Sequence, residues 1–425
     1  MRAPDDSRHV VVISIDGLRP DHLRRPGLAI PTLRALMAAG VTADGVVSVW
    51  PSVTYPAHVT MVTGVSPAKH GVLTNKVFDP LGKTNDAWVW EASAIRARTL
   101  WDAAREGHVS TGASYWPVTV GAPIDCLVPQ IWRDRTDADD ALMRKLTTPG
   151  LADELEKLGK LPAEHRTDRE RARAAAHILR TRAPGLMLVY LTDLDTVQHK
   201  TGPMSPEADR TLERIDGDVA SLVAAIDEAG ARERTTFVVL SDHGFSPVSH
   251  AVRPNVALAK AGLLDVDGRG NVTGYRATAV TAGGLAGIVL ARSDDAATID
   301  TVTHLFEGLA KDPASGIARV YRNVEMTARG GFPDALLVLE AAERHTFVAG
   351  ARGPLVSGTD YRGNHGGPPD RTELHASLIL SGKGVRAGAK LGVVSLVDVA
   401  PTIARLLKLR MDATEGRVLE EALTP

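Results

Sequence analysis

Short hydrophobic runs along the chain are typical of strands buried on both faces of a parallel sheet. Three runs are rich in Val, Ile and Leu, at residues 10–15, 186–191 and 236–240, and a further strand is expected over 109–113. Helical patterns separate these runs and cover residues 32–39, 100–106, 166–182 and 206–229. The alternation of strand and helix predicts an α/β fold with a doubly wound, mostly parallel sheet and helices on both faces.

This rhythm breaks between about residues 253 and 353. Strands are expected there over 285–290 and 336–339, and a helix over 297–309. The main pattern resumes with a strand over 376–380 and a helix over 396–407, with Ser395 as its N-cap and Pro401 as a residue that kinks it or delays its start. We therefore predict a core of residues 1–252 and 354–425 and a small α+β insertion or cap of residues 253–353.

Composition excludes several classes of protein. The 425 residues are 44% hydrophobic and 24% charged, which allows one sizeable core. A net charge of -2 provides no basic field for a nucleic acid polymer and no polybasic membrane patch, and no window approaches ~18 uninterrupted apolar residues. A single cysteine, Cys126, excludes a disulfide framework. The sequence leaves the oligomeric state open.

The N-terminal residues predict the compartment only for the chain as numbered. They lack the cationic start and the longer apolar core of a signal peptide, so a cytoplasmic protein is expected. An exported protein is expected if a leader was trimmed.

Polar side chains follow the buried runs where each strand is expected to end. Ligands gather at the carboxyl ends of the strands in open α/β sheets. Alone, each such residue is more often a cap or turn residue, but together they form a candidate cluster. Its members are Asp16, Asp195, His199, Asp242, His243 and, in a Gly-rich segment, His365.

The residue types in this cluster predict a metal site. Carboxylates and neutral imidazoles in equal supply are ligands of zinc or a similar borderline ion, whereas oxygen ligands alone would indicate magnesium or calcium. Three Asp and three His, with one hydroxyl, are enough for two ions about 4 Å apart. We therefore expect two Zn²⁺, although other divalent ions also fit this set.

Thr54 provides a hydroxyl at the expected N-terminus of a short helix. It lies between a Trp50-Pro51 bend and Pro56, and the helix after Pro56 is expected to close at Gly64. An ordinary N-cap threonine is one interpretation. The other is a nucleophile, because a helix N-terminus favours an anion and a bound cation lowers the pKa of the hydroxyl.

With these motifs in view, the chain resembles the alkaline phosphatase superfamily and, within it, the type I phosphodiesterase/nucleotide pyrophosphatase family. The matching segments are ISIDGLRPDHL, PSVTYPAHVTMVTGVSPAKHGVLTN, SYWPV, LTDLDTVQHKTGP, LSDHGF and GNHGG, and they span nearly the whole chain. The resemblance implies an alkaline phosphatase-like core and hydrolysis of phosphodiester or pyrophosphate bonds in nucleotide-type, small-molecule substrates.

The resemblance also implies roles for individual residues. Thr54 is expected to be the nucleophile that forms a phosphothreonine, and Asn75 the amide that contacts the phosphate. One zinc ion is expected on Asp16, Asp242, His243 and Thr54, and the other on Asp195, His199 and His365.

Substrate contacts are less well defined by the motifs. Tyr55 follows the nucleophile, where relatives often have an aromatic residue that holds a base. Trp116 is a second candidate to line the cleft, although core packing is an equally good interpretation of it. A phosphomonoesterase or phosphonate hydrolase with the same metals is the alternative, and a non-catalytic phospho-ligand binding protein is a third reading.

Four other polar residues compete with the chosen set. His58 and His70 lie close to Thr54 and are expected to be structural, because the ligand set is complete without them. His375 could replace His365, and Asp193 could replace Asp195. Asp195 is preferred because its D-x-x-x-H spacing to His199 matches the family.

Overall fold

A computed structural model of the chain describes residues 8–84, 87–132, 137–159 and 167–425. Its main feature is an eight-stranded sheet with the order β19-β2-β18-β6-β1-β5-β3-β4. Every strand except β18 runs in the same direction, because β18 alone is antiparallel to both of its neighbours. The strands are β1 (His9–Ile15), β2 (Gly40–Val47), β3 (Thr111–Ser114), β4 (Cys126–Val128), β5 (Leu186–Leu191), β6 (Thr235–Leu240), β18 (Leu378–Gly382) and β19 (Leu391–Ser395). The predicted α/β fold with a mostly parallel sheet is confirmed.

Helices cover both faces of this sheet. In β1, Val11, Ile13 and Ile15 belong to one hydrophobic cluster and Val10 and Val12 to another, because successive side chains of a strand point to opposite faces. The first cluster is closed by α2 (Pro31–Ala38), α8 (Asp168–Arg182) and α10 (Pro206–Glu228), and the second by α3 (Thr54–Thr63), α5 (Leu100–Glu106) and α14 (Val399–Leu406). Smaller helices are α1 (Pro20–Arg24), α4 (Pro67–His70), α6 (Asp137–Leu146), α7 (Leu151–Leu158) and α9 (Asp193–Thr201).

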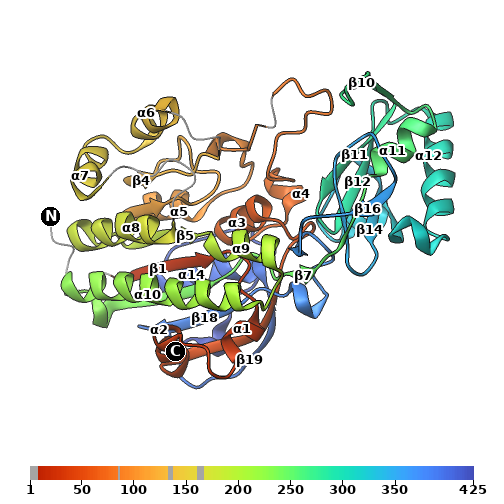
Figure 1. Cartoon of the computed structure of the whole chain (residues 1–425). Helices are drawn as coiled ribbons and strands as arrows, with labels where there is room; N and C mark the ends of the chain where they lie inside the picture. The colour runs from red at the N-terminus through yellow and green to blue at the C-terminus, as the bar shows by residue number, and fades with distance from the viewer. Residues whose placement is uncertain (1–7, 85–86, 133–136, 160–166) are drawn as a thin grey trace.

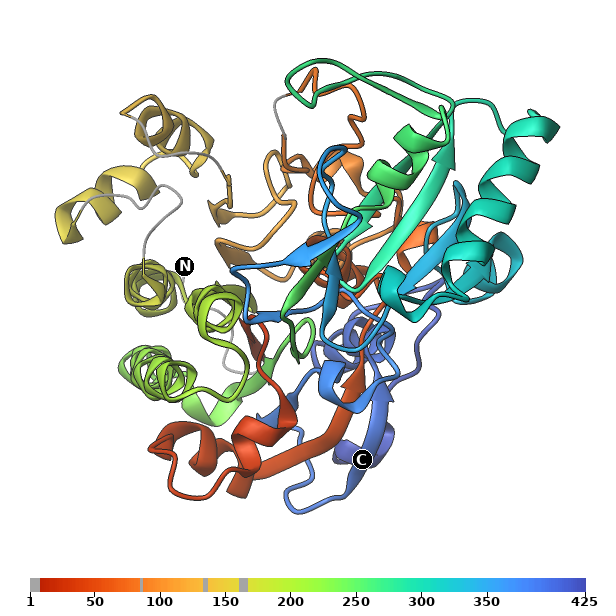
Figure 2. The ribbon, with the colours of Figure 1, turned by 45° about the vertical axis from the view of Figure 1, so that its right-hand side comes forward.

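A second, antiparallel sheet lies beside the core (Figures 1 and 2). Its order is β11-β12-β14-β13, and α12 (Ala296–Leu309) lies on its outer side. Leu258, Val302 and Phe306 from the neighbouring helices pack with its strands into a separate hydrophobic cluster. The elements of this region are α11 (Pro254–Lys260), β9 (Leu264–Val266), β10 (Val272–Tyr275), β11 (Ala277–Ala282), β12 (Leu285–Leu290), β13 (Ile317–Arg322), α13 (Asn323–Ala328) and β14 (Ala335–Ala341).

Short strands connect the two sheets. The pair β7 (Ser246–Pro247) and β17 (Gly363–Asn364) is antiparallel, and β8 (His250–Val252) pairs with β15 (His345–Phe347) and β16 (Val356–Gly358). Since β7 follows β6 closely and β17 ends at Asn364, this pairing brings His365 back to the carboxyl edge of the core sheet.

The structure differs from the sequence prediction at several elements, among them the strand predicted over 109–113, which spans Thr111–Ser114. Strand β2 was not predicted, because Gly40, Asp44 and Gly45 interrupt its hydrophobic run. Its pairing with β18 and β19 makes it a strand. The strand predicted over 376–380 begins at Leu378. The last helix begins at Val399 after a 3₁₀ turn, Leu396–Asp398, so that Pro401 lies in the first turn, where its missing N–H costs nothing.

Candidate metal centre and active site

The carboxyl ends of three adjacent parallel strands carry most of the candidate ligands. The strands β5, β1 and β6 are neighbours, and the backbone N–H of Asp16 donates to the carbonyl of Leu191 at 2.9 Å. Asp242 and His243 follow β6 after one intervening residue, Ser241, and Asp195 lies in the first turn of α9 after β5. Sheet pairing therefore brings together side chains that are more than 200 residues apart.

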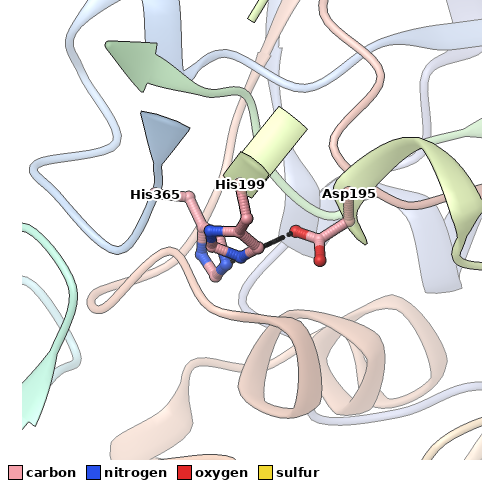
Figure 3. A group of neighbouring side chains, drawn as sticks. All are labelled: Asp195, His199 and His365. Atoms are coloured by element: carbon pink, nitrogen blue, oxygen red, sulfur yellow. Dashed lines mark ion pairs between the residues drawn. The ribbon is translucent and has the colours of Figure 1, made fainter. Parts of the chain in front are cut away.

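Helix α9 and the segment after β17 form the first group (Figure 3). Asp195 and His199 are four residues apart on one helix face, with 3.4 Å between Oδ1 and Nε2. His365 comes from the segment after β17, and its Nε2 lies 3.6 Å from the same oxygen. The three residues form one of two groups of side chains able to hold a metal ion among the described residues.

Backbone carbonyls orient both imidazoles of this group. His199 donates from Nδ1 to the carbonyl of Gly363 at 3.1 Å, and His365 donates from Nδ1 to the carbonyl of Ser52 at 3.1 Å. Donation from Nδ1 leaves the lone pair on Nε2, which is the atom directed at Asp195. Both rings are therefore held in the tautomer that a metal ligand needs.

Asp16, Asp195 and His243 form the second group. His243 Nε2 lies 3.3 Å from Asp16 Oδ1 and 3.3 Å from Asp242 Oδ2. The rings of His243 and His365 stack with their centroids 3.6 Å apart, so that the two groups touch. Asp195 belongs to both groups, which therefore form one continuous cluster.

Several buried polar atoms of this cluster lack a hydrogen-bond partner within the described ranges. They are Asp16 Oδ1, Asp195 Oδ1, Asp242 Oδ2 and His243 Nε2. Burying such atoms without a partner is costly, and they all belong to residue types that bind zinc. The donor set therefore fits bound cations.

The carboxylates of the cluster also repel one another. Burial, followed by the charge of Asp242, raises the pKa of Asp16 well above its usual range, and burial also raises the pKa of Asp242. Burial acts in the same direction on Asp195, but the neighbouring His199 and His365 hold its pKa below the usual range. A bound cation would relieve this repulsion and favour the ionised carboxylates.

Thr54 is the first residue of α3 and not its N-cap. The N-cap is Val53, with no capping bond from a side chain, so the ordinary N-cap interpretation of Thr54 is wrong. Its neighbours are tied to the site, because the carbonyl of Ser52 accepts from His365 and the N–H of Tyr55 donates to Asn75 Oδ1 at 2.8 Å. Thr54 therefore lies at a helix N-terminus between a candidate ligand and the candidate phosphate contact.

A hairpin-like pairing holds Asn75 in place. The N–H of Val89 donates to the carbonyl of Asn75 at 3.0 Å, and the N–H of Val77 donates to the carbonyl of Ala87 at 2.8 Å. The bond from Tyr55 occupies the side-chain oxygen of Asn75, so its NH₂ is the group that can donate to a ligand.

Two predicted substrate contacts need correction. Trp116 has 0% of its surface exposed and packs edge-on against His58, so it belongs to the core and not to the cleft wall. Tyr55 is only 1% exposed and lies beneath Trp88, with 5.2 Å between the ring centroids. The side chain of Tyr55 is therefore not available as a platform for a base.

The competing residues lie outside the two groups. His58 and His70 are fully buried, and their rings bond to the Thr54 carbonyl and to Thr60 Oγ1 respectively. Asp193 accepts from the backbone of Asp168, and neither it nor His375 belongs to the groups that could hold a metal ion.

A cavity of about 460 Å³, which the sequence pattern did not indicate, lies beside the cluster. Asn75 and His365 line this cavity, as do Thr278 and Thr281 of β11 in the second sheet. Phe78, Trp88 and Tyr361 supply aromatic walls. The aromatic residues that follow Asn75 in the sequence could have indicated this cavity. Their spacing has no periodicity, so the sequence pattern could not predict that they line a cavity.

Comparison with known proteins decides the family. The model of the type I phosphodiesterase/nucleotide pyrophosphatase family matches residues 10–368. The chain belongs to this family. The resemblance stated from the sequence motifs is therefore confirmed.

Curated relatives in the family are longer than the matched region. The chain is 28% identical over 251 residues to an uncharacterised pyrophosphatase/phosphodiesterase of Schizosaccharomyces pombe, covering 56% of this chain and 45% of the relative. It is 26% identical over 245 residues to ectonucleotide pyrophosphatase/phosphodiesterase family member 1 of Rattus norvegicus, covering 56% of this chain and 24% of the relative. The match thus spans less than half the length of these relatives.

Solved structures of the family share the fold. Murine ectonucleotide pyrophosphatase/phosphodiesterase 5 has a TM-score of 0.72 at 20% identity, covering 98% of this chain and 100% of the other. An inactive variant of the same murine protein in complex with AMP gives the same TM-score of 0.72, identity of 20% and coverage of 98% and 100%. Among the described residues, no helix has the length and apolar character needed to cross a membrane.

Proposed function

We propose that this protein is a metal-dependent hydrolase that cleaves phosphodiester or pyrophosphate bonds in nucleotide-type substrates. The observation that carries the proposal is the buried cluster of unpartnered carboxylate and imidazole atoms beside the N-terminus of α3, in a chain of this family. Two zinc ions are the cofactors that the donor set fits best.

The proposed ligands divide into two sets. Asp16, Asp242, His243 and Thr54 would hold one ion, and Asp195, His199 and His365 the other. Bound there, the ions would lower the pKa of the Thr54 hydroxyl and stabilise negative charge on the leaving oxygen.

The chain's own groups would orient the phosphate. At the start of α3 the Tyr55 N–H is bonded to Asn75 and Pro56 has no N–H, so the Thr54 N–H is the group left for a ligand; together with the helix dipole it favours an anion there. The NH₂ of Asn75 donates to a non-bridging phosphate oxygen. Thr54 Oγ1 would attack phosphorus in line while the bond from phosphorus to the leaving oxygen breaks, giving a phosphothreonine that keeps the other ester group. Water would then attack the same phosphorus in line, break its bond to Thr54 Oγ1 and release a phosphate monoester in a second inversion.

The cavity beside the cluster supports a substrate with a flat organic group. Phe78, Trp88 and Tyr361 are large apolar surfaces within reach of a group attached to a phosphate at Asn75. The murine relative in complex with AMP supports a nucleotide as the substrate class. A phosphomonoester or phosphonate substrate is the competing proposal, and Lys76 in the cavity wall is the cation that would favour it.

A comparison of two chromogenic substrates tests the substrate class. We expect faster turnover of bis-nitrophenyl phosphate than of nitrophenyl phosphate by the zinc-loaded chain. A strong preference for the monoester would overturn the diesterase proposal in favour of the phosphomonoesterase.

A single substitution tests the mechanism and separates an enzyme from a binding protein. Thr54→Ala should abolish turnover while most of the zinc content remains, since six ligands are left. Thr301→Ala, at an exposed position of α12, is the control and should match the wild type. Unchanged turnover in Thr54→Ala would exclude Thr54 as the nucleophile.

A further inference from the structure

A tyrosine outside the proposed ligand set is bonded directly to one of its members. The hydroxyl of Tyr190 donates to Asp16 Oδ2. Tyr190 lies near the end of β5, where it pairs with Ser14 of β1. Because β1 and β5 are adjacent parallel strands, their register places the phenol next to the carboxylate that follows β1.

This bond gives the two oxygens of Asp16 different roles. Oδ2 is occupied by Tyr190, whereas Oδ1 is buried, lies 3.3 Å from His243 Nε2 and has no hydrogen-bond partner among the described residues. The carboxylate is thus held with one oxygen directed into the cluster. Without the phenol, rotation of the side chain could direct either oxygen there.

The packing around Tyr190 fixes the position of its hydroxyl. The side chain is 3% exposed, and its ring meets the ring of His58 edge-on with the centroids 4.5 Å apart. The guanidinium carbon of Arg171 lies 5.7 Å from the same ring. A phenol confined in this way can orient Asp16 at little entropic cost.

We propose that Tyr190 is a positioning residue that orients Asp16 for metal binding and thereby strengthens the binding of the ion held by Asp16, Asp242 and His243. The proposal rests on the proposed function. Hydrogen bonds to metal-ligating carboxylates set ligand orientation, and their removal typically weakens metal affinity by about 10–100-fold. A purely structural role for the same bond would change stability but not zinc affinity.

Equilibrium zinc retention tests the proposal on the full-length, zinc-loaded chain. Zinc per chain is measured after dialysis against a series of chelator-buffered free zinc concentrations. Tyr190→Phe removes only the hydroxyl, and it should lose one ion at a free zinc concentration about 10–100-fold higher than the wild type. Retention of the ion assigned to Asp195, His199 and His365 should change little.

The second sheet offers a matched control. The hydroxyl of Tyr321 donates to Glu340 Oε2 at 2.6 Å, and Tyr321 is 4% exposed. This pair therefore matches Tyr190 and Asp16 in its phenol–carboxylate bond and in its burial, but it does not belong to the groups that could hold a metal ion. Tyr321→Phe should retain as much zinc per chain as the wild type at each free zinc concentration. Should Tyr190→Phe not fold, Tyr190→Met fills the space with a flexible apolar side chain, and the same shift is expected.

A double-mutant comparison checks that the effect passes through Asp16. In an Asp16→Asn background, adding Tyr190→Phe should shift zinc retention by less than threefold, because the oriented carboxylate is already gone. A zinc curve of Tyr190→Phe that overlaps the wild type, or an equal shift in Tyr321→Phe, would overturn the inference alone. A wild-type chain that retains no zinc would overturn the proposed function as well.

Discussion

Asn75 shows how one side chain can serve both the backbone and the substrate. Its oxygen accepts from the N–H of Tyr55, and its carbonyl accepts from Val89, so the amide is fixed from two sides. The NH₂ is then the free end of a fixed side chain that lines the cavity. A donor held in place before the reaction stabilises developing charge without reorganisation.

We predict that Asn75→Asp lowers kcat by about 10²-fold or more. The substitution keeps an oxygen for the Tyr55 N–H but replaces the donor with a negative charge that repels the phosphate. Steady-state kinetics on the diester substrate provides the measurement, with Asn271→Asp at an exposed turn as the control. Wild-type kcat in Asn75→Asp would show that the amide does not contact the reacting phosphate.

Buried histidines away from the cluster predict acid sensitivity. His22 is 0% exposed, and burial, followed by the charge of Arg19, lowers its pKa to about 4. The folded state therefore takes up its proton at lower pH than the unfolded state does. Below about pH 6.5 the unfolded chain binds more protons, so stability falls as the pH drops toward 4.

His22→Gln should reduce this loss of stability on acidification. One such histidine lowers the free energy of unfolding by roughly 2–3 kcal/mol when the pH falls from 7 to about 4.5. The test compares urea midpoints at pH 7 and pH 4.5 for the wild type, His22→Gln and the exposed control His304→Gln. Equal losses in the first two proteins would show that His22 is protonated in the folded state.

At the scale of elements, the Gly-rich segment after β17 determines where His365 lies. Gly366 has a φ of +78°, and its N–H donates to the carbonyl of Ser52 at 3.0 Å. A Cβ at this position would lie 1.7 Å from the carbonyl oxygen of Ala282 at the end of β11. The second sheet therefore packs directly against the backbone that presents a candidate ligand.

Gly366→Ala is predicted to displace His365 and to lower zinc content by about one of the two proposed ions, with loss of turnover. Gly388→Ala is the matched control, because its φ is +74° but no atom of the described residues lies within 4 Å of the added Cβ. Both substitutions place an alanine in the left-handed backbone region, which costs about 1–2 kcal/mol. Only Gly366→Ala also brings its Cβ into a clash with a backbone atom. Equal zinc content in the two variants would contradict the role of this close approach.

At the scale of the whole molecule, the cluster joins segments from both ends of the chain. Asp16 follows β1 and His365 follows β17, and the cavity beside His365 is lined by Asn75 and Trp88 of the core and by β11 of the second sheet. Ions bound by ligands this far apart in sequence stabilise the folded chain, because the unfolded chain does not bring the ligands together.

Chelation should therefore inactivate the protein and lower its Tm, and added zinc should restore both. Free zinc at 1,000 times Kd would stabilise the folded state by about 4 kcal/mol. Thermal unfolding and diester turnover are measured before chelation, after chelation and after zinc is returned, with zinc-saturated chelator as the control. Full turnover in the chelated protein would exclude a two-ion mechanism.

Strong local signals explain which elements could be predicted. Strand β5 has the predicted bounds because its hydrophobic stretch is continuous. Helix α5 has the predicted bounds because Gly107 ends it. In contrast, β2 is interrupted by polar and Gly residues, and its place in the sheet depends on pairing with β18 and β19. No local pattern contains that information.

The sequence by itself determined the family, the strands that carry the sheet and the residue types at their carboxyl ends, because motif identity and hydrophobic runs are local properties. Only the tertiary structure decided which of these side chains face one another. It buried Tyr55 and Trp116, opened a cavity beside Trp88 and placed the phenol of Tyr190 on Asp16. Exposure and partners depend on segments distant in the chain, so a residue's type and position in the sequence could not predict them.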